Sequence, residues 1–319
     1  MSSSTIPTVP QAGIWVPAVT LFDPETDELM PKDQSRYYKY LASTGLAGLV
    51  ILGTNAETFL LTREERQQLV RLARDAVGPE FPLLVGVSGH GTRQVLEFID
   101  DAVEAGANYG LLLPPAYFGK ATTPAVIEGF YDEIAAKSRL PIVIYNFPGV
   151  CNGVDLDSDT IARLAQRHPA KVVGVKLTCG SVAKVTRLAA VLPADRFATF
   201  GGQSDFLLGG LAVGSAGCIC AFGNVFPRVV VEIYRLWKEG KHQEALALQQ
   251  KQSLAEQPCK GGIASVKYAA ALYTAPKAGI EDAERKMRPR RPYLEAGAAA
   301  KEACKTGMAE VAKIEEDLA

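Results

Sequence analysis

The chain has 319 residues, 48% of them hydrophobic, so a single domain can bury a large core. Its 34 basic and 35 acidic residues give a formal net charge of -1, which argues against nucleic acid or an anionic membrane surface as a partner. We expect a small-molecule ligand, uncharged or modestly anionic. The sequence shows no secretory signal and no apolar run that could span a membrane, so we expect a cytoplasmic protein.

Cysteine and histidine spacing bears on disulfides and metals. The six cysteines include no CxxC pair, and the three histidines, His90, His168 and His242, are scattered along the chain. This pattern lacks the spacing of a metal site. We therefore expect free thiols in a reducing compartment and no structural metal.

Eight short runs rich in β-branched and apolar residues recur along the chain, and we expect each to be a strand. They cover residues 14–19, 48–52, 83–87, 109–113, 142–145, 172–176, 197–200 and 217–221. The segments between them have the periodicity of amphipathic helices. Eight alternating strand and helix units predict an α/β fold, a (β/α)8 TIM barrel of parallel strands.

Helix signals support this prediction. Thr62 followed by Glu65 predicts a capped helix start, and Gly45 and Gly106 fall where the preceding helices should end. After the eighth strand, helical stretches are expected near residues 228–238, 242–255, 262–273 and 298–317. This exceeds the one helix that closes a barrel, so we expect a catalytic barrel over residues 1–235 and a C-terminal helical extension over residues 236–319.

The basic segment at residues 286–292 (KMRPRRP) links the last two of these helical stretches. It could form a patch for phosphate or nucleic acid. Because the overall charge is balanced, a solvated surface connection is favoured, and we do not expect a functional site there.

Lys176 ends one apolar run and would place an amine at the carboxyl end of a core strand. With a period of two, Lys176 shares a face with Val172 and Gly174, and Val173 points to the other face. Because a buried ammonium is costly, such a lysine tends to be neutral and nucleophilic and forms imines with carbonyl compounds. The alternative is a lysine with a buried stem whose amine reaches solvent.

Other strand ends carry polar groups, and the active sites of such barrels lie at these ends. Tyr145 ends the fifth strand, where its phenol could pass a proton to a substrate or be a satisfied core hydroxyl. Residues 53–57 (GTNAE) follow the second strand and offer a hydroxyl, an amide and backbone N–H groups that can hold a carboxylate. The alternative for this motif is a turn with a helix cap.

Two further loops leave alternatives open. His90 follows the third strand and has no evident partner for acid–base work, so a loop-structural role or a contact at the substrate's edge is favoured. The glycine-rich ends after the seventh and eighth strands are typical of phosphate sites in these barrels. Neither loop contains a lysine or arginine, which weakens that alternative.

Three motifs, found in this order, resemble the dihydrodipicolinate synthase and N-acetylneuraminate lyase family of class I pyruvate aldolases: residues 53–57 (GTNAE), 145–149 (YNFPG) and 174–176 (GVK). The similarity extends from residue 13 to residue 224. It implies that Lys176 is the Schiff-base lysine and Tyr145 the proton-relay phenol. It also implies that Thr54 and Asn55, next to Gly53, hold the substrate carboxylate.

Departures from the synthase branch of this family bear on the substrate. That branch has two threonines where this chain has Thr54 and Asn55, and an arginine where this chain has Val150. Without that arginine a second, distal carboxylate lacks its expected partner, so dihydrodipicolinate synthesis is not favoured. Asn55 and residues 115–118 (PAYF) are more similar to the 4-hydroxy-2-oxoglutarate aldolase and 2-keto-3-deoxy-sugar-acid aldolase branches.

The resemblance implies an aldolase that needs no cofactor beyond its own lysine and cleaves a 2-keto-3-deoxy sugar acid, or a related 4-hydroxy-2-oxo acid, to pyruvate and an aldehyde. Candidate contacts for the rest of the substrate are His90, Tyr117, Thr178, Gly202 and Ser204. A synthase working by condensation, a phosphate-binding isomerase and a catalytically silent binding or assembly barrel are the alternatives.

The resemblance also implies a homotetramer built from dimers. Related enzymes have adjacent tyrosines, one of which reaches the active site of a neighbouring subunit. This chain has Tyr117 and Phe118 at that place, and the sequence does not decide which of them matches the relay position.

Overall fold

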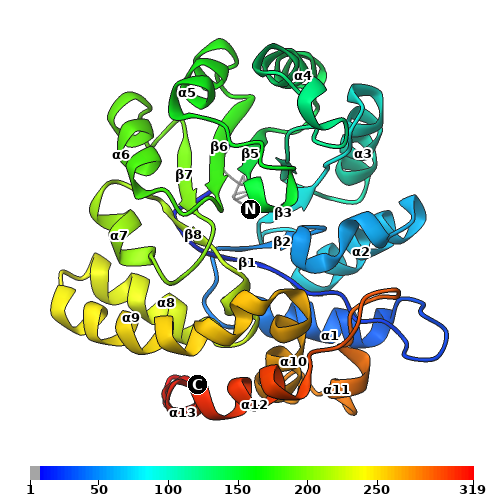
Figure 1. The fold of residues 1–319 in the computed structure, drawn as a ribbon, viewed down its shortest axis with the longest axis vertical. Helices are drawn as coiled ribbons and strands as arrows, with labels where there is room; N and C mark the ends of the chain where they lie inside the picture. Colours follow the sequence, from blue (N-terminus) through cyan, green and yellow to red (C-terminus); the bar gives the residue numbers. More distant parts are fainter. Residues whose placement is uncertain (1–7) are drawn as a thin grey trace, which may run out of the picture.

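The computed structural model describes residues 8–319. Eight parallel strands, each paired with the next and the last paired with the first, close into a barrel (Figure 1). The strands are β1 Gly13–Pro17, β2 Gly48–Ile51, β3 Leu83–Gly86, β4 Tyr109–Leu112, β5 Ile142–Asn146, β6 Val172–Leu177, β7 Ala198–Gly201 and β8 Gly217–Ile219. The predicted TIM barrel is confirmed, and the strands lie within a few residues of their expected positions.

Helices follow the strands and surround the barrel. They are α1 Pro31–Ala42, α2 Arg63–Val77, α3 Thr92–Glu104, α4 Pro124–Lys137, α5 Ser158–Arg167, α6 Val182–Val191, α7 Leu207–Ala212 and α8 Pro227–Lys238. The predicted cap of α2 is confirmed, because the Thr62 hydroxyl accepts from the Glu65 amide and the Glu65 carboxylate accepts from the Thr62 amide. Gly45 and Gly106 both have positive φ just after α1 and α3, as expected of residues that end helices.

The start of β6 departs from the predicted alternation of side chains. The register between β5 and β6 shifts by one residue at Ile142 and Val143, which marks a β-bulge in β6. Val173 packs with the residues of the barrel interior, whereas Val172 packs in the cluster that the strands share with the helices. The prediction that Val172 shares the face of Lys176 and that Val173 opposes it is therefore wrong, because the bulge reverses the alternation before the lysine.

The C-terminal helices gather on one side of the barrel, beside α1 and α8 (Figure 1). They are α9 His242–Glu256, α10 Ile263–Tyr273, α11 Ala283–Lys286, α12 Ala298–Gly307 and α13 Ala309–Asp317, and the 3-10 helix η6 Gln257–Gly261 joins α9 to α10. The stretch expected at 298–317 is thus two helices. One hydrophobic cluster includes residues from both the barrel and these helices, and the division at residue 235 stays a prediction.

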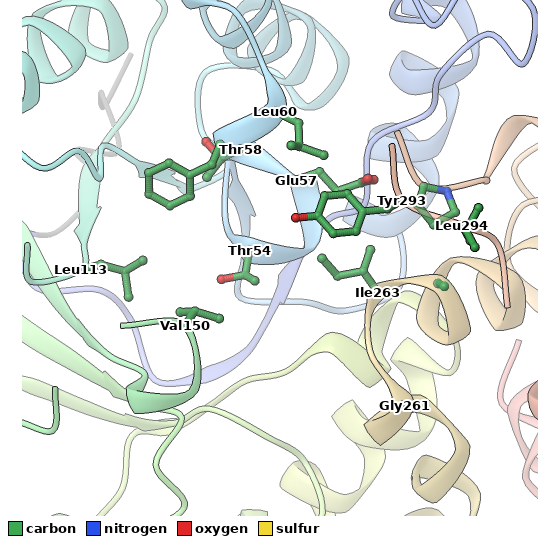
Figure 2. A pocket seen from close by; sticks show the side chains of 13 residues that line it. Thr54, Glu57, Thr58, Leu60, Leu113, Val150, Gly261, Ile263, Tyr293 and Leu294 are labelled. Atoms are coloured by element: carbon green, nitrogen blue, oxygen red, sulfur yellow. The ribbon is translucent and has the colours of Figure 1, made fainter. Parts of the chain in front are cut away.

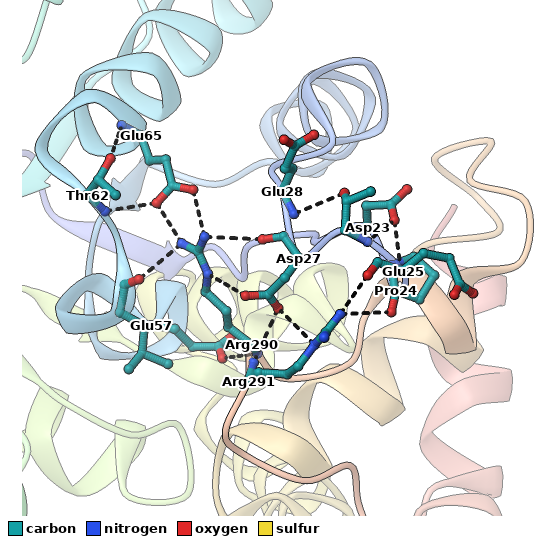
Figure 3. A network of polar contacts seen from close by, with 12 residues as sticks. Asp23, Pro24, Glu25, Asp27, Glu28, Glu57, Thr62, Glu65, Arg290 and Arg291 are labelled. Carbon is teal, nitrogen blue, oxygen red and sulfur yellow. Dashed lines mark hydrogen bonds and ion pairs between the residues drawn. The ribbon is translucent and has the colours of Figure 1, made fainter.

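The basic segment at residues 286–292 is held more firmly than predicted. The Arg290 side chain is 13% exposed, and its two terminal nitrogens donate to the Glu65 carboxylate over 2.6 and 2.8 Å. It also donates to the carboxylate and the carbonyl of Asp27 (Figure 3). The prediction of a solvated connection is therefore wrong for Arg290, because acidic residues of the barrel side enclose its guanidinium.

Two expectations concern membranes and secretion. Among the helices of residues 8–319, none combines the length and the apolar character needed to cross a membrane. The expectation that no secretory signal is present concerns the first residues of the chain, and residues 1–7 lie outside the described part.

Candidate active site

Lys176 and Tyr145 are register partners on β6 and β5, and both side chains are buried at the carboxyl ends of their strands. Lys176 Nζ donates to Tyr145 Oη over 3.2 Å and lies 4.2 Å from the centre of the tyrosine ring. Tyr145 Oη in turn lies 3.2 Å from Thr54 Oγ1. Lys176 is 2% exposed, so its amine does not extend into solvent. The three groups form one continuous chain along which a proton can move.

A cavity of about 370 Å³ contains this chain of polar groups. The barrel contributes Thr54, Asn55, Tyr145, Phe147, Val150, Lys176, Thr178, Gly202, Gln203 and Ala221 to its lining. The C-terminal extension contributes Glu256, Cys259, Lys260, Gly262, Ile263 and Val266. The site therefore has one wall that the barrel alone does not supply.

The turn after β2 presents Thr54 and Asn55 to the cavity. It is the 3-10 helix η1 Thr54–Ala56, closed by the Ala56 amide donating to the Gly53 carbonyl over 3.1 Å and the Glu57 amide donating to the Thr54 carbonyl over 3.0 Å. Gly53 thus helps to build the turn, and its own atoms are not part of the cavity lining. The Thr54 hydroxyl and the Asn55 side-chain amide at this place are suited to donate hydrogen bonds to a carboxylate.

The Glu57 carboxylate ties the same turn to the C-terminal extension. Glu57 has left-handed backbone angles, φ 57° and ψ 38°, which is uncommon outside glycine. Its carboxylate accepts from Lys267 Nζ on α10 over 2.8 Å. It also accepts from the Arg290 amide over 2.7 Å (Figure 3). Burial lowers the pKa of Lys267, and the Glu57 carboxylate opposes this effect. The extension therefore fixes the position of the turn that carries Thr54.

Thr178 and Gly202 face each other in the cavity after β6 and β7. A Cβ atom on Gly202 would lie 2.2 Å from Thr178 Oγ1 and 2.5 Å from Thr178 Cα, so glycine is required there. Among the described residues, Thr178 Oγ1 is buried and has no hydrogen-bond partner. Because an unsatisfied buried hydroxyl is costly, this group is suited to bind a polar atom of a ligand.

Besides Gly53, three of the predicted substrate-binding residues lie outside the cavity lining. Ser204 is fully buried, and its hydroxyl donates to Glu256 Oε2 over 2.6 Å. His90 is exposed, its Nδ1 accepts from the Ala116 amide over 3.3 Å, and its ring stacks on Phe59. Tyr117 is 73% exposed beside His90. Direct contact of these residues with substrate stays a prediction.

Sequence reasoning missed Glu256 and Lys260, which come from the end of α9 and from η6. Lys260 Nζ contacts Asp205 at 2.8 Å, Glu256 at 2.9 Å and Gln203 at 2.8 Å. Burial acts to lower the pKa of Lys260, but the two carboxylates outweigh it and raise that pKa. The only sequence signal was that Glu256 and Lys260 lie four residues apart, a spacing typical of an ion pair on one helix. This spacing does not show which part of the barrel the two side chains face.

A second chamber of about 390 Å³ adjoins the cavity and shares Thr54, Val150 and Ile263 with it. Figure 2 shows Tyr293 and Leu294 across this chamber from Leu113 and Val150. Its lining is mostly apolar. Within residues 8–319, no group of three or more histidine, cysteine, aspartate or glutamate side chains is placed to hold a metal ion.

Comparisons with known proteins agree on the family. The family model of the dihydrodipicolinate synthetase family matches residues 10–308. A Coccidioides immitis protein provisionally named mitochondrial 4-hydroxy-2-oxoglutarate aldolase is 64% identical over 313 residues, which are 98% of this chain and 99% of that protein. A Hypocrea jecorina protein named L-threo-3-deoxy-hexylosonate aldolase is 34% identical over 324 residues, 98% of this chain and 99% of that protein.

A solved structure is similar over the same length. A crystal structure of a Coccidioides immitis protein, provisionally assigned to the dihydrodipicolinate synthase family, has a TM-score of 0.93 and 60% sequence identity. The match covers 99% of this chain and 100% of that one, so both the barrel and the C-terminal helices are shared. The motifs, the closed barrel and these matches together show that the chain belongs to the dihydrodipicolinate synthetase family.

Proposed function

We propose that this protein is a class I aldolase that cleaves 2-keto-3-deoxy acids to pyruvate and an aldehyde. The observation that carries the proposal is the buried amine of Lys176, 3.2 Å from the Tyr145 hydroxyl, in a cavity large enough for a small sugar acid. The aldolase names of the two relatives support the same reaction class.

In the proposed mechanism, the uncharged amine of Lys176 attacks the C2 carbonyl of the substrate, and loss of water gives an iminium. Tyr145 takes the proton of the C4 hydroxyl as the C3–C4 bond breaks, and the electron pair of that bond moves to the iminium to form an enamine. The aldehyde then leaves. A proton returns to C3, and water hydrolyses the imine to release pyruvate and restore the amine.

Thr54 and Asn55 are proposed to hold the C1 carboxylate during these steps. Their side chains line the cavity together with Lys176, and Thr54 also contacts the Tyr145 hydroxyl. Holding the carboxylate fixes C2 next to the amine and C4 next to the phenol, which lowers the entropic part of the barrier. No cofactor beyond the lysine enters this mechanism.

The assembly is proposed to be a homotetramer built from dimers. Three aromatic side chains lie close together on the surface near the site: Phe59, Tyr117 and Phe118 are 57%, 73% and 74% exposed. Aromatic residues are enriched in subunit interfaces, which supports covering of this patch by a second copy and a shared site that receives Tyr117 or Phe118. Sedimentation of the wild type and of Phe118→Glu tests this, because the charged variant should dissociate the interface.

The location in the cell is a further part of the proposal. The sequence predicts a cytoplasmic location, whereas the name of the Coccidioides immitis relative places that protein in mitochondria. Microscopy of the full chain with a C-terminal fluorescent tag distinguishes the two locations.

Turnover of candidate substrates tests the proposed activity. The enzyme is incubated with a 2-keto-3-deoxy-hexonate, 4-hydroxy-2-oxoglutarate, or pyruvate with aspartate semialdehyde, and pyruvate is followed with lactate dehydrogenase and NADH. Release of pyruvate from either of the first two substrates supports the aldolase. Consumption of pyruvate with aspartate semialdehyde alone would identify a synthase instead.

A further inference from the structure

We propose that Lys260, Glu256 and Asp205 form a subsite that selects substrates with a neutral polyhydroxyl tail over substrates with a second carboxylate. The inference rests on the proposed aldolase function and specifies its substrate. The relatives leave this point open, because one is named for a dicarboxylic substrate and the other for a deoxy sugar acid.

The ammonium of Lys260 has no free hydrogen in this arrangement. Its three hydrogens match three acceptors, one oxygen each from Asp205, Glu256 and Gln203, at 2.8, 2.9 and 2.8 Å. A distal carboxylate would have to displace one of these partners to bind Lys260. Because Glu256 is only 4% exposed, losing its cation would leave a buried carboxylate with an uncompensated charge.

The second carboxylate oxygen of Glu256 also accepts hydrogen bonds, which makes this wall of the cavity rigid. Glu256 Oε2 accepts from the Ser204 hydroxyl over 2.6 Å and from Gln252 Nε2 over 2.8 Å. Gln252 is itself fully buried and accepts a hydrogen bond from Gln249. Ser204 therefore acts on the cavity through Glu256, which gives this predicted site residue an indirect role.

The balance of charge disfavours an anionic tail. The subsite combines one cation with two carboxylates, for a formal charge of -1; Lys260 and Glu256 line the cavity, and Asp205 pairs with Lys260 without being part of the lining. Among the described residues that line the cavity, the only other lysine or arginine is Lys176, whose amine the reaction uses at C2. Val150, at the place where the resemblance implies an arginine in the synthase branch, lines the cavity and supplies no charge. A second carboxylate would thus meet net repulsion and no free cation.

A tail of hydroxyl groups fits the same wall. Each hydroxyl can donate to a carboxylate oxygen and accept from another group, so it can join the network without displacing an ion pair. The Thr178 hydroxyl, which is buried and has no partner among the described residues, lies in the same cavity and can bond to such a tail. Sites built to hydrogen-bond a hydroxyl discriminate strongly against ligands that lack it.

Comparison of two substrates tests the inference. We expect kcat/KM of the wild type to be about tenfold or more higher for a 2-keto-3-deoxy-hexonate than for 4-hydroxy-2-oxoglutarate. Lys260→Met removes the cation that holds the Glu256 and Asp205 carboxylates in place, so it should lower kcat/KM for the hexonate by about tenfold or more. Glu256→Gln should weaken the preference for the hexonate, because it removes a negative charge from the wall.

Two controls separate this inference from the proposed function. Lys251→Met removes a lysine of α9 that pairs with Glu310 at the surface, and it should leave turnover of both substrates unaffected. Trapping of pyruvate on Lys176 by borohydride involves no tail, and Lys260→Met should leave its rate unchanged, which also shows that the variant is folded.

A wild type that traps pyruvate but prefers 4-hydroxy-2-oxoglutarate would overturn the subsite alone. So would a Glu256→Gln variant that keeps the full preference of the wild type for the hexonate. A wild type that traps no pyruvate would overturn the aldolase proposal and this inference with it.

Discussion

Glu57 and Lys267 form an ion pair at 2.8 Å, and their side chains are only 3% and 0% exposed. The two residues are 210 positions apart in the sequence. Glu57 directly follows the turn that carries Thr54, and Lys267 lies on α10 of the extension. The pair therefore connects the proposed carboxylate-binding turn to the C-terminal helices.

Removing one partner of this pair should be costly. Lys267→Met leaves the Glu57 carboxylate buried without its cation, and we expect the free energy of unfolding to fall by about 3 kcal/mol or more. Urea unfolding measures this loss. The double variant Glu57→Gln with Lys267→Met leaves no uncompensated charge, so it should recover part of the stability. A single variant as stable as the wild type would show that the pair does not hold the turn.

Tyr145→Phe should separate covalent binding from bond cleavage. The variant keeps the ring beside Lys176 but lacks the group that accepts the C4 proton, so kcat for cleavage should fall by about 100-fold or more. Borohydride should still trap pyruvate on Lys176 after longer incubation. Tyr131→Phe is the matched control, because this buried tyrosine donates to the Leu112 carbonyl and lies outside the cavity lining. Unchanged cleavage by Tyr145→Phe would remove Tyr145 from the mechanism.

Gly202→Ala should impair the site through its overlap with Thr178. The added Cβ would lie 2.2 Å from Thr178 Oγ1, so the Thr178 backbone or side chain must move. We expect a loss of about 1–3 kcal/mol in stability and a lower kcat/KM. Gly91→Ala is the control, because a Cβ there meets no atom within 4 Å. If Gly202→Ala and Gly91→Ala had equal stability and equal kcat/KM, the predicted overlap between residue 202 and Thr178 would be contradicted.

Stability should depend on the ionisation of Glu315. Burial raises the pKa of this carboxyl to about 7, although the amides of Val229 and Arg228 donate to it and act to lower the pKa. The folded state therefore binds a proton more tightly than the unfolded state. This stabilisation is complete below the unfolded pKa and is lost as the pH rises through about 7.

Glu315→Gln should flatten this pH dependence. Between pH 5 and pH 8 the wild type should lose on the order of 2 kcal/mol that the variant does not lose. Urea unfolding of both proteins at the two pH values measures the difference. An identical change in both proteins would show that Glu315 is already ionised at the lower pH.

The barrel was predictable because each of its strands carries a local signal. Runs such as residues 109–113 are short, apolar and bounded by turn residues, and their number and alternation with helices are enough to indicate the fold. The bulge that reverses Val172 and Val173 was not predictable, since it depends on pairing with β5 rather than on the residues of β6 themselves.

The residues of the site that lie at strand ends were predictable in the same way. Lys176, Tyr145 and Thr54 each follow or end a strand, and the barrel topology brings such ends together. Lys260 and Glu256 were missed because they belong to helices whose docking position depends on long-range packing. Arg290 was assigned to a solvated segment for the same reason, since its partner Glu65 is 225 residues away.

The covalent bond between Lys176 and pyruvate is the central claim, and intact-mass measurement after borohydride reduction tests it most directly. The wild type should gain the mass of one reduced pyruvate imine, and peptide mapping should place the modification on Lys176. Lys176→Ala should gain no mass and lose cleavage of every 2-keto-3-deoxy acid. An unmodified wild type, or a Lys176→Ala variant that still releases pyruvate, would contradict the account.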